Sequence, residues 1–456
     1  MSNIQLFDYQ QNALDETKEF NKVAYYLDMG LGKTFVGSEK LKILNSKVNL
    51  LICQKSKIDD WIQHFKDYYA QHEKDFSCED LIFDLTDKKQ LERFMSETRQ
   101  ATEPCYIEDE WTGQSYQQEN LYPYSIIGII NYDLVFRRSE LLQLKHFTLM
   151  LDESSLIQND TAKRSKFILK MKPNNVILLS GTPTSGKYEN LWSQMNLLGW
   201  NISKELYNRQ YVNWVKVEQD GFIHFVIDKE EPYKNVDRLK QKMRDYGSVF
   251  LKTEECFDLP EQIFIPITVQ KTKEYIKFRK KGLVTIDEVE LVGDSTLTKR
   301  LYSRMLCGHY NKAKLQAFKD LASSTKDRLI VFYNFNAELD ALQRIAAELE
   351  RPVSQVNGHI KDLTAYETEE DSITLVQYQA GAMGLNLQKA NKVVFFTLTD
   401  KSELFEQSKK RVHRIGQNKT CFYYLMMCKD SVEEVILDTL NQRKDFTDEL
   451  FKECEV

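Results

Sequence analysis

The sequence predicts an α/β protein with two domains, each built on a parallel β-sheet flanked by helices. Short apolar runs rich in β-branched and aromatic residues occur in two groups, with a long charged stretch between them. Runs of this length are typical of strands that are buried on both faces, as in parallel sheets. The segments between the runs have helical patterns, and alternation of strands with helices indicates βαβ units. The 456 residues suffice for two to four domains at roughly 100–200 residues each.

The positions of the apolar runs set the expected domain limits. The first group comprises residues 23–27, 48–53, 125–130, 147–151 and 176–179. The second group comprises residues 329–333, 373–376, 392–396 and 421–427. We therefore expect an α/β domain over 1–200 and a helical insertion or linker over 201–260. A second α/β domain should span 261–456, with a helical insertion near 271–324.

Composition indicates a folded intracellular protein. Apolar residues make up 42% of the chain, which is enough for buried cores and too much for a disordered protein. The chain has no run of about 18 apolar residues, and its N-terminus lacks a signal-peptide core. The eight cysteines form no CxxC pair, which argues against a zinc site or a disulfide framework. We expect a cytoplasmic protein with no membrane partner.

A glycine-rich turn follows the first expected strand, where residues 28–34 are Asp-Met-Gly-Leu-Gly-Lys-Thr. Backbone N–H groups of such a turn at a helix N-terminus can bind phosphates, and Gly30 and Gly32 allow close backbone approach. Lys33 would reach the β- and γ-phosphates of ATP, and the Thr34 hydroxyl would bind Mg²⁺. The strict phosphate-loop pattern requires glycine where Leu27 stands, so an ordinary strand-to-helix turn is the alternative.

An acidic pair, Asp152 and Glu153, directly follows the expected strand over 147–151. Ligands of open α/β sheets bind at the carboxyl ends of the strands, where this pair would lie. Asp152 would hold Mg²⁺ through water, and Glu153 would orient and deprotonate the attacking water. Two adjacent acids are common in proteins. Their position downstream of the glycine-rich turn is what indicates a catalytic role for this pair.

The order of these motifs resembles the Swi/Snf-type ATPases of superfamily 2. Leu6-Phe-Asp-Tyr9-Gln10 is similar to the adenine-reading motif of that family, and residues 29–34 match its phosphate loop. Other matches are residues 50–56 followed by Trp61, residues 129–132, and the coupling motif Ser180-Gly181-Thr182-Pro183. The resemblance covers most of the chain. It implies two RecA-like domains, ATP and Mg²⁺ as cofactors, and Gln10 as an adenine ligand.

Two motifs in the second half extend the resemblance. Gly381-Ala-Met-Gly384-Leu-Asn386-Leu is similar to the fifth motif of the family, which implies that Gly384 lies at the nucleotide. The run from Gln407 to Gln417 is similar to the sixth motif. Its pattern predicts a helix over 407–414 in which Arg411 and Arg414 share a face. The resemblance implies that Arg414 is an arginine finger, that Arg411 is its neighbour and that Gln407 lies close to the nucleotide, whereas a solvated basic helix is the alternative.

The chain departs from the family pattern at several places. Ser154-Ser155 stands where the acidic box of the family has Ala-His, so the resemblance does not extend to coupling through that histidine. Gln54 replaces a usual proline. Gln377-Tyr378-Gln379 replaces small hydroxyl and basic residues, so contacts with a DNA backbone there should differ.

We expect an ATP-dependent nucleic-acid motor, and the resemblance points to a DNA-stimulated ATPase that translocates on duplex DNA. The alternatives are a strand-separating DNA or RNA helicase and an ATP-gated DNA-binding scaffold with little turnover. The net charge of −6 does not exclude nucleic acid, because binding needs only a local basic groove. Basic clusters lie at 163–172, 238–244 and 277–281, and for each of them a solvated helix face is the alternative. No appended module is evident, which favours a minimal bacterial, phage or mobile-element motor.

Overall fold

The computed structural model describes residues 5–70, 81–102, 105–108, 115–118, 125–219, 221–381 and 385–451. The chain divides into two compact units. The first comprises residues 1–256 and 447–456, and the second comprises residues 257–446. The long helix α18 (Val432–Phe451) begins in the second unit, and its last residues belong to the first.

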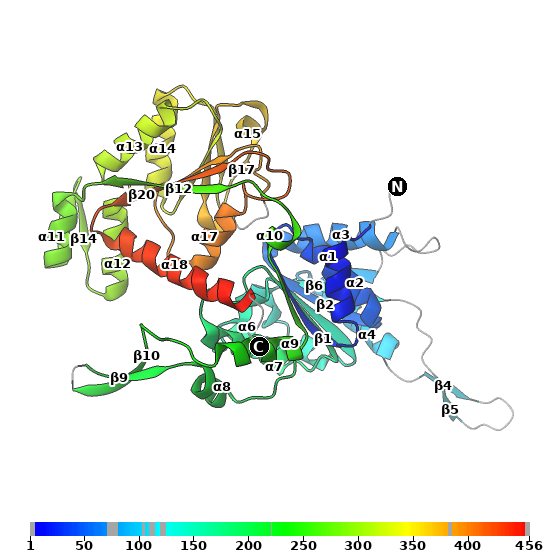
Figure 1. Cartoon of the computed structure of the whole chain (residues 1–456). Coiled ribbons are helices and arrows are strands. Elements are labelled where there is room, and N and C mark those ends of the chain that lie inside the picture. Colours follow the sequence, from blue (N-terminus) through cyan, green and yellow to red (C-terminus); the bar gives the residue numbers. More distant parts are fainter. Residues whose placement is uncertain are drawn as a thin grey trace. The chain divides into compact units, whose positions relative to one another are not determined.

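A seven-stranded sheet forms the centre of the first unit (Figure 1), and every strand pair in it is parallel. Its order is β11 (Ser248–Leu251), β1 (Lys22–Leu27), β8 (Asn175–Ser180), β7 (Phe147–Asp152), β2 (Val48–Cys53), β6 (Ile126–Asn131) and β3 (Ile82–Asp84). Nearly every residue of the central strands is buried, as the continuous apolar runs predict. The phosphate-loop strand β1 and the acid-pair strand β7 both pair with β8, so their carboxyl ends lie at one edge.

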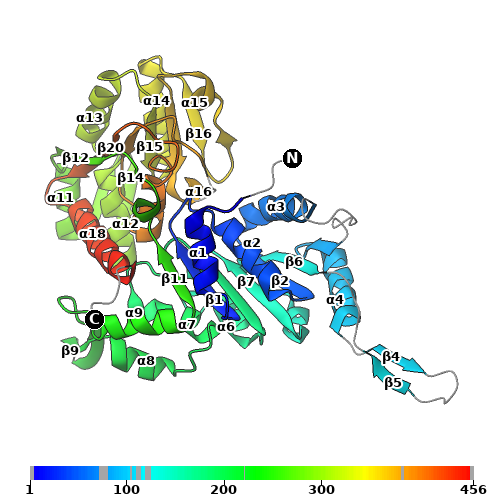
Figure 2. The same cartoon turned by 45° about the vertical axis from the view of Figure 1, so that its right-hand side comes forward.

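Helices cover this sheet. Figure 2 shows α1 and α2 along one face, and α2 packs against β1, β7 and β8. The helices are α1 (Asp8–Glu16), α2 (Lys33–Leu44), α3 (Ile58–Ala70), α4 (Lys88–Thr102), α5 (Tyr132–Val135), α6 (Lys163–Lys170), α7 (Trp192–Leu197), α8 (Lys204–Tyr211), α9 (Val236–Asp245) and α10 (Thr253–Cys256). A small hairpin of β4 (Cys105–Glu108) and β5 (Ser115–Gln118) follows α4.

The second unit contains another seven-stranded sheet, parallel except at one edge. Its order is β12 (Gln262–Val269), β20 (Cys421–Cys428), β19 (Lys392–Phe395), β15 (Leu329–Tyr333), β18 (Ile373–Gln377), β16 (Val353–Val356) and the antiparallel β17 (Lys361–Asp362). Alternate residues of β15 enter two different core clusters: Ile330 and Phe332 join one, and Leu329, Val331 and Tyr333 join the other. The sheet is therefore buried on both faces.

Helices α13 to α18 divide between those two cores, whereas α11 and α12 pack into a third cluster with Tyr275, Phe278 and Leu306. Helices α13 and α14, which Figure 1 shows next to each other, supply one core, and α15, α16, α17 and α18 supply the other. The helices are α11 (Lys273–Lys281), α12 (Thr296–Cys307), α13 (Lys312–Ser323), α14 (Asn336–Glu348), α15 (Thr364–Thr368), α16 (Tyr378–Gly381) and α17 (Ser402–Lys409). The expected fold class, two RecA-like α/β domains with parallel sheets flanked by helices, is confirmed.

Two segments differ from the sequence-based expectation. Residues 201–260 are not only a helical insertion, because they contribute β11 to the first sheet and a hairpin of β9 (Trp214–Gln219) and β10 (Phe222–Ile227). Figure 1 shows this hairpin projecting beyond α8. Residues 271–324 are helical as expected but also contain the hairpin of β13 (Leu283–Ile286) and β14 (Val289–Val292). Among the described helices, none is both long and apolar enough to cross a membrane.

Candidate active site

The glycine-rich turn has the backbone that a phosphate loop requires. Gly30 and Gly32 have φ values of 91° and 74°, in the left-handed region that side chains disfavour. A Cβ atom on Gly32 would lie 2.2 Å from Nε2 of Gln10, so any larger residue would also collide with the glutamine. Gly32 is the N-cap residue of α2, and the first N–H groups of that helix therefore lie at the turn.

Gln10, the expected adenine ligand, contacts this turn directly. Its Nε2 donates to the carbonyl oxygen of Leu31 at 3.0 Å, and its Oε1 accepts the N–H of Phe7 at 3.0 Å. The side chain is buried, and Tyr9 donates to the same Leu31 carbonyl. The N-terminal helix α1 and the phosphate loop are therefore joined at the residue that the resemblance assigns to the base.

Lys33 lies at the start of α2 with its ammonium group inside the turn. Nζ donates to the carbonyl oxygens of Leu27 at 2.9 Å and Asp28 at 3.2 Å. A Cβ atom on Gly181 would lie 3.3 Å from the same Nζ, so the Ser180–Pro183 loop borders the lysine. The structure thus brings the phosphate loop and the coupling motif together.

Asp152, at the end of β7, accepts a hydrogen bond that the sequence did not reveal. Nε1 of Trp61 on α3 donates to its Oδ2 at 2.8 Å. Burial raises the pKa of this carboxyl group, while the Trp61 hydrogen bond and the charge of Lys33 oppose the shift. Trp61 belongs to one of the motifs that carry the family resemblance, and the structure shows that it contacts Asp152. A divalent cation would compensate the desolvated carboxylate.

Glu153 occupies a strained backbone conformation with φ 56° and ψ 59°. A non-glycine residue in this region is uncommon, and such outliers gather at functional sites. Its Oε2 accepts a hydrogen bond from Ser180 Oγ at 3.5 Å. The hydroxyl of Tyr132 donates to the carbonyl oxygen of Asp152 at 2.9 Å and so holds the backbone just before Glu153. Burial raises the pKa of Tyr132 well above its usual value, so this hydroxyl remains a donor.

The second unit brings its fifth and sixth motifs into contact. The Arg414 guanidinium donates to Oδ1 of Asn386, and the carbonyl oxygen of Arg411 accepts the N–H of Leu387 at 3.0 Å. The side chain of Arg411 is buried, whereas that of Arg414 is partly exposed. Gln407 is buried on α17, and Gly384 lies outside the described residues.

The expected helix over residues 407–414 is wrong at its end. Helix α17 stops at Lys409, and both arginines follow it in a series of turns. Contacts from other segments replace the helical pattern: the Arg411 carbonyl bonds to Leu387, and Nε2 of His413 lies 2.8 Å from the carbonyl oxygen of Pro260. The two arginines therefore do not share a helix face.

The cationic side chains of the three basic clusters differ in their exposure to solvent. Lys163, Lys166, Lys170 and Lys172, on and just beyond α6, are exposed, as are Lys277, Arg279, Lys280 and Lys281 on α11. Most cations of the cluster on α9 have partners. Buried Lys240 pairs with Asp237 and Glu449, and Arg244 lies over the ring of Phe250, whereas Arg238 is exposed. Of these three clusters, those on α6 and α11 are the more exposed cationic surfaces.

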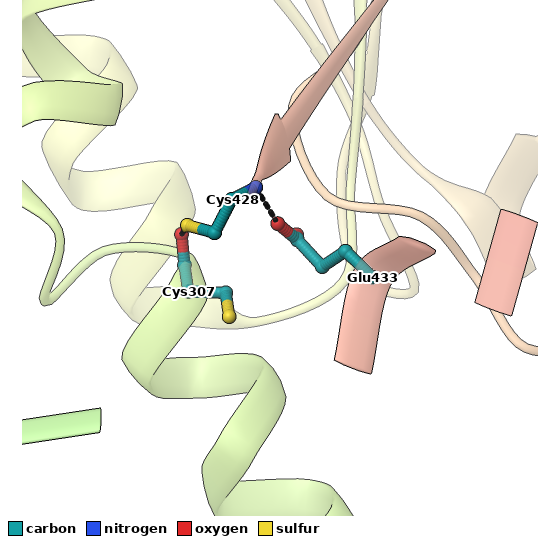
Figure 3. A group of neighbouring side chains, drawn as sticks. All are labelled: Cys307, Cys428 and Glu433. Carbon is teal, nitrogen blue, oxygen red and sulfur yellow. Dashed lines mark hydrogen bonds between the residues drawn. The ribbon is translucent and has the colours of Figure 1, made fainter. Parts of the chain in front are cut away.

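Cys307, Cys428 and Glu433 form a buried cluster of potential metal ligands in the second unit (Figure 3), with ligand atoms within 4.8 Å of one another. Both carboxylate oxygens of Glu433 already have partners. Oε1 accepts from Lys314 Nζ at 2.6 Å, and Oε2 accepts the N–H of Cys428 at 2.9 Å. We interpret the cluster as a buried ion pair that joins α13 and α18 to the end of β20.

The first-unit residues fit a nucleoside triphosphate with Mg²⁺. Lys33 places a cation at the turn, and Thr34 and Asp152 carry hard oxygen atoms of the kind that Mg²⁺ prefers as ligands. Gly30 has open space where a Cβ would stand, so the loop leaves room for close approach to phosphate. This fold and these residues define the class of phosphate-loop, nucleoside-triphosphate-binding α/β proteins.

Comparison with known proteins identifies the family. The SNF2-related domain matches residues 26–319, more than half of the chain, and the helicase conserved C-terminal domain matches residues 313–416. The chain therefore belongs to the SNF2-related family.

Individual relatives are distant. The chain is 23% identical over 331 residues to an uncharacterised ATP-dependent helicase of Mycoplasma genitalium, covering 66% of this chain and 30% of that protein. It is 23% identical over 358 residues to the ATPase of an ISWI chromatin-remodelling complex of Saccharomyces cerevisiae, covering 70% and 31%. The chain thus spans about a third of the length of these curated relatives. A solved SWI2/SNF2 ATPase core of Sulfolobus solfataricus in complex with double-stranded DNA aligns with a TM-score of 0.44, 19% identity, and coverage of 98% and 92%.

Proposed function

We propose that this protein is an ATP-driven motor that hydrolyses ATP in response to duplex DNA and translocates along it. The observation that carries the proposal is the assembly at one edge of the first sheet. There Gln10 contacts the phosphate loop, Lys33 lies within it, and Glu153 is bonded to the Ser180–Pro183 loop. Membership of the SNF2-related family supports the same function.

Each site residue of the first unit would have a separate role in ATP hydrolysis. Gln10 would read the adenine edge, because an amide both donates and accepts. Lys33 and the N–H groups of the turn would hold the β- and γ-phosphates. Thr34 and Asp152 would hold Mg²⁺, which when bound neutralises charge on the phosphates. Glu153 would orient the attacking water and accept its proton.

The second unit would contribute the cation that completes the site. We assign Arg414 as the arginine finger, with Arg411 and Gln407 as supporting residues and the backbone at Gly384 near the nucleotide. A guanidinium placed at the transferred phosphoryl group can accelerate hydrolysis by roughly 10³–10⁵-fold. Because the finger and Lys33 belong to different units, the nucleotide would favour their closed arrangement and hydrolysis would release it.

Duplex DNA is the proposed track. The ISWI relative acts in chromatin remodelling, and another relative, 21% identical over 90% of this chain, is a DNA repair and recombination protein of yeast. Exposed lysines of α6 can contact backbone phosphates independently of sequence. In the second unit, a cavity of ≈ 240 Å³ at the carboxyl ends of β15 and β18 is lined by polar groups that include Arg304, Asn334, Gln377, Gln379 and Lys401.

We propose that the protein acts in the cytoplasm of a bacterial or phage-infected cell.

The test is steady-state ATP hydrolysis with no nucleic acid, duplex DNA, single-stranded DNA or RNA. We expect the largest rise in kcat with duplex DNA, and loss of turnover in Lys33→Ala and Glu153→Gln. A wild-type rate that duplex DNA leaves unchanged contradicts the proposal. A tailed duplex that the protein unwinds would indicate a helicase instead, and tight ATP-dependent DNA binding without turnover would indicate a scaffold.

A further inference from the structure

A buried glutamine joins the two loops that border the candidate site. Ser154 Oγ donates to Gln194 Oε1 at 2.8 Å, and Gln194 Nε2 donates to the carbonyl oxygen of Pro183 at 2.6 Å. The hydroxyl of Tyr26 also donates to Oε1, at 3.1 Å. The side chains of Gln194, Ser154 and Tyr26 are all 0% exposed. The glutamine therefore lies on a hydrogen-bonded path from the acidic box to the coupling motif.

The chemistry of the partners fixes the orientation of the Gln194 amide. A proline carbonyl can only accept, so the NH₂ group must face Pro183. The amide oxygen then faces Tyr26 and Ser154, whose hydroxyls both donate to it. Burial raises the pKa of Tyr26 far above its usual value, so the tyrosine stays a donor. Flipping the amide would place its NH₂ group against both hydroxyls and its oxygen against a carbonyl.

The two ends of this path are adjacent to residues with proposed chemical roles. Ser154 follows Glu153, whose backbone is strained, and Pro183 ends the loop in which Ser180 contacts the Glu153 carboxylate. Ser154 also occupies the place where the resembling acidic box has alanine, a residue without a hydrogen-bonding side chain. The hydrogen bond to Gln194 thus comes from Ser154, a residue at which this protein differs from the acidic box of the resembling family.

We propose that Gln194 is a positioning residue that locks the Glu153 turn to the Ser180–Pro183 loop, so that the two move as one body. The inference rests on the proposed function. Gln194 touches no reacting atom and acts only through Glu153 and the loop. Releasing it would let the base shift relative to the phosphate loop, and misplacement by about 1 Å can cost on the order of 100-fold in rate.

The experiment measures kcat and KM for ATP, with and without duplex DNA, for the wild type, Ser154→Ala and Gln194→Leu. We expect kcat to fall about tenfold or more in both variants, while the affinity for ADP stays within about twofold of the wild type. The control is Tyr25→Phe, which removes a buried hydroxyl bonded to Thr17 at 2.6 Å and should leave kcat unchanged. The double variant should be no slower than Gln194→Leu alone, because both changes break one link.

A pH profile of Gln194→Glu separates positioning from simple loss of packing. A protonated carboxyl group can still donate to the Pro183 carbonyl, and an ionised one cannot. The rate of this variant relative to the wild type should therefore fall as the pH rises from about 6 to about 9. A relative rate that is constant with pH overturns the proposed donor role.

The outcomes distinguish the two proposals. If duplex DNA fails to stimulate the wild type, the proposed function is contradicted, and kcat without DNA in the same variants still tests Gln194. If Ser154→Ala folds, binds ADP and retains kcat within about twofold, the positioning role is overturned. Additive losses in the double variant would also overturn it, because they would mean that the two side chains act separately.

Discussion

At the scale of single residues, the contact between Trp61 and Asp152 carries a direct prediction. The indole N–H orients the carboxylate that we assign to Mg²⁺, and partners of this kind typically contribute about 10–100-fold in metal affinity or activity. Trp61→Phe keeps an aromatic ring against Phe65 but removes the donor. We expect the Mg²⁺ concentration for half-maximal ATP hydrolysis to rise by about tenfold or more.

The matched control for that variant is Trp192→Phe. Its indole N–H donates to the carbonyl oxygen of Ile202 at 2.8 Å, so the change also deletes one indole hydrogen bond in the first unit. The Mg²⁺ titration of this control should coincide with that of the wild type. Coinciding titrations of Trp61→Phe and the wild type would show that Asp152 does not need its tryptophan partner.

At the scale of elements, the buried ion pair of Lys314 and Glu433 should dominate the attachment of α13 to α18. Both side chains are almost fully inaccessible, at 0% and 2%. Lys314→Met would leave a buried carboxylate without its cation, which typically costs about 3–5 kcal/mol. Lys319→Met on the same helix removes the partner of exposed Glu348 and should change the free energy of unfolding far less, because exposed ion pairs contribute little.

Urea unfolding of the full-length variants provides the measurement. The double variant Lys314→Met/Glu433→Gln should recover much of the loss, because no uncompensated charge then remains. Equal effects of the two lysine substitutions would contradict our interpretation of the cluster as an ion pair.

The packing of α3 against α2 predicts a pH dependence of stability. Burial lowers the pKa of His64 to about 4, and the ring contacts Trp61 and Phe35 and lies 2.9 Å from Ser38 Oγ. The unfolded chain, with a histidine pKa of about 6.5, binds this proton more readily than the folded protein. The stabilisation of the fold by neutral His64 is therefore complete above about pH 6.5. It is lost as the pH falls toward about 4, and the free energy of unfolding then decreases by at most about 1.4 kcal/mol per pH unit.

The free energy of unfolding, measured by urea titration between about pH 7 and about pH 5, checks this sign. His64→Gln should reduce the fall in stability with decreasing pH. His224→Gln, which changes an exposed histidine on β10, should leave the fall unaltered. A wild-type protein that gains stability on acidification over this range would contradict the role of His64.

How far the sequence predicts each element depends on whether local pattern or distant contact decides it. Strand β15 is a continuous apolar run and β2 is apolar except for Asn49, and the predicted limits of both match the structure. The edge strand β12 was missed because Pro266 interrupts its pattern, and only an edge strand tolerates proline within a sheet. The four-residue strand β11 is too short to distinguish without its partner β1.

The same distinction holds within the site. Four site residues could be recognised because each lies in a short local motif with a known chemical role: Lys33, Thr34, Asp152 and Glu153. Gln194 could not, since its partners Ser154 and Tyr26 lie 40 and 168 residues away in the sequence. The turns that hold Arg411 and Arg414 also depend on contacts with Leu387 and Pro260, which no local periodicity encodes.

At the scale of the whole molecule, the proposed motor function requires groups from both units to act on one nucleotide. Lys33 and Glu153 belong to the first unit, and Arg414 belongs to the second. If Arg414 acts only in the transition state, its removal should slow the chemical step without weakening the binding of nucleotide.

The most direct test is therefore kcat and nucleotide affinity of Arg414→Ala at saturating duplex DNA, compared with Lys410→Ala four positions away. We predict that Arg414→Ala lowers kcat by about 10³-fold or more while its affinity for a non-hydrolysable ATP analogue stays within about threefold of the wild type. Lys410→Ala should retain nearly full activity. An Arg414→Ala variant that hydrolyses ATP at the wild-type rate would contradict the claim that both units act on one nucleotide.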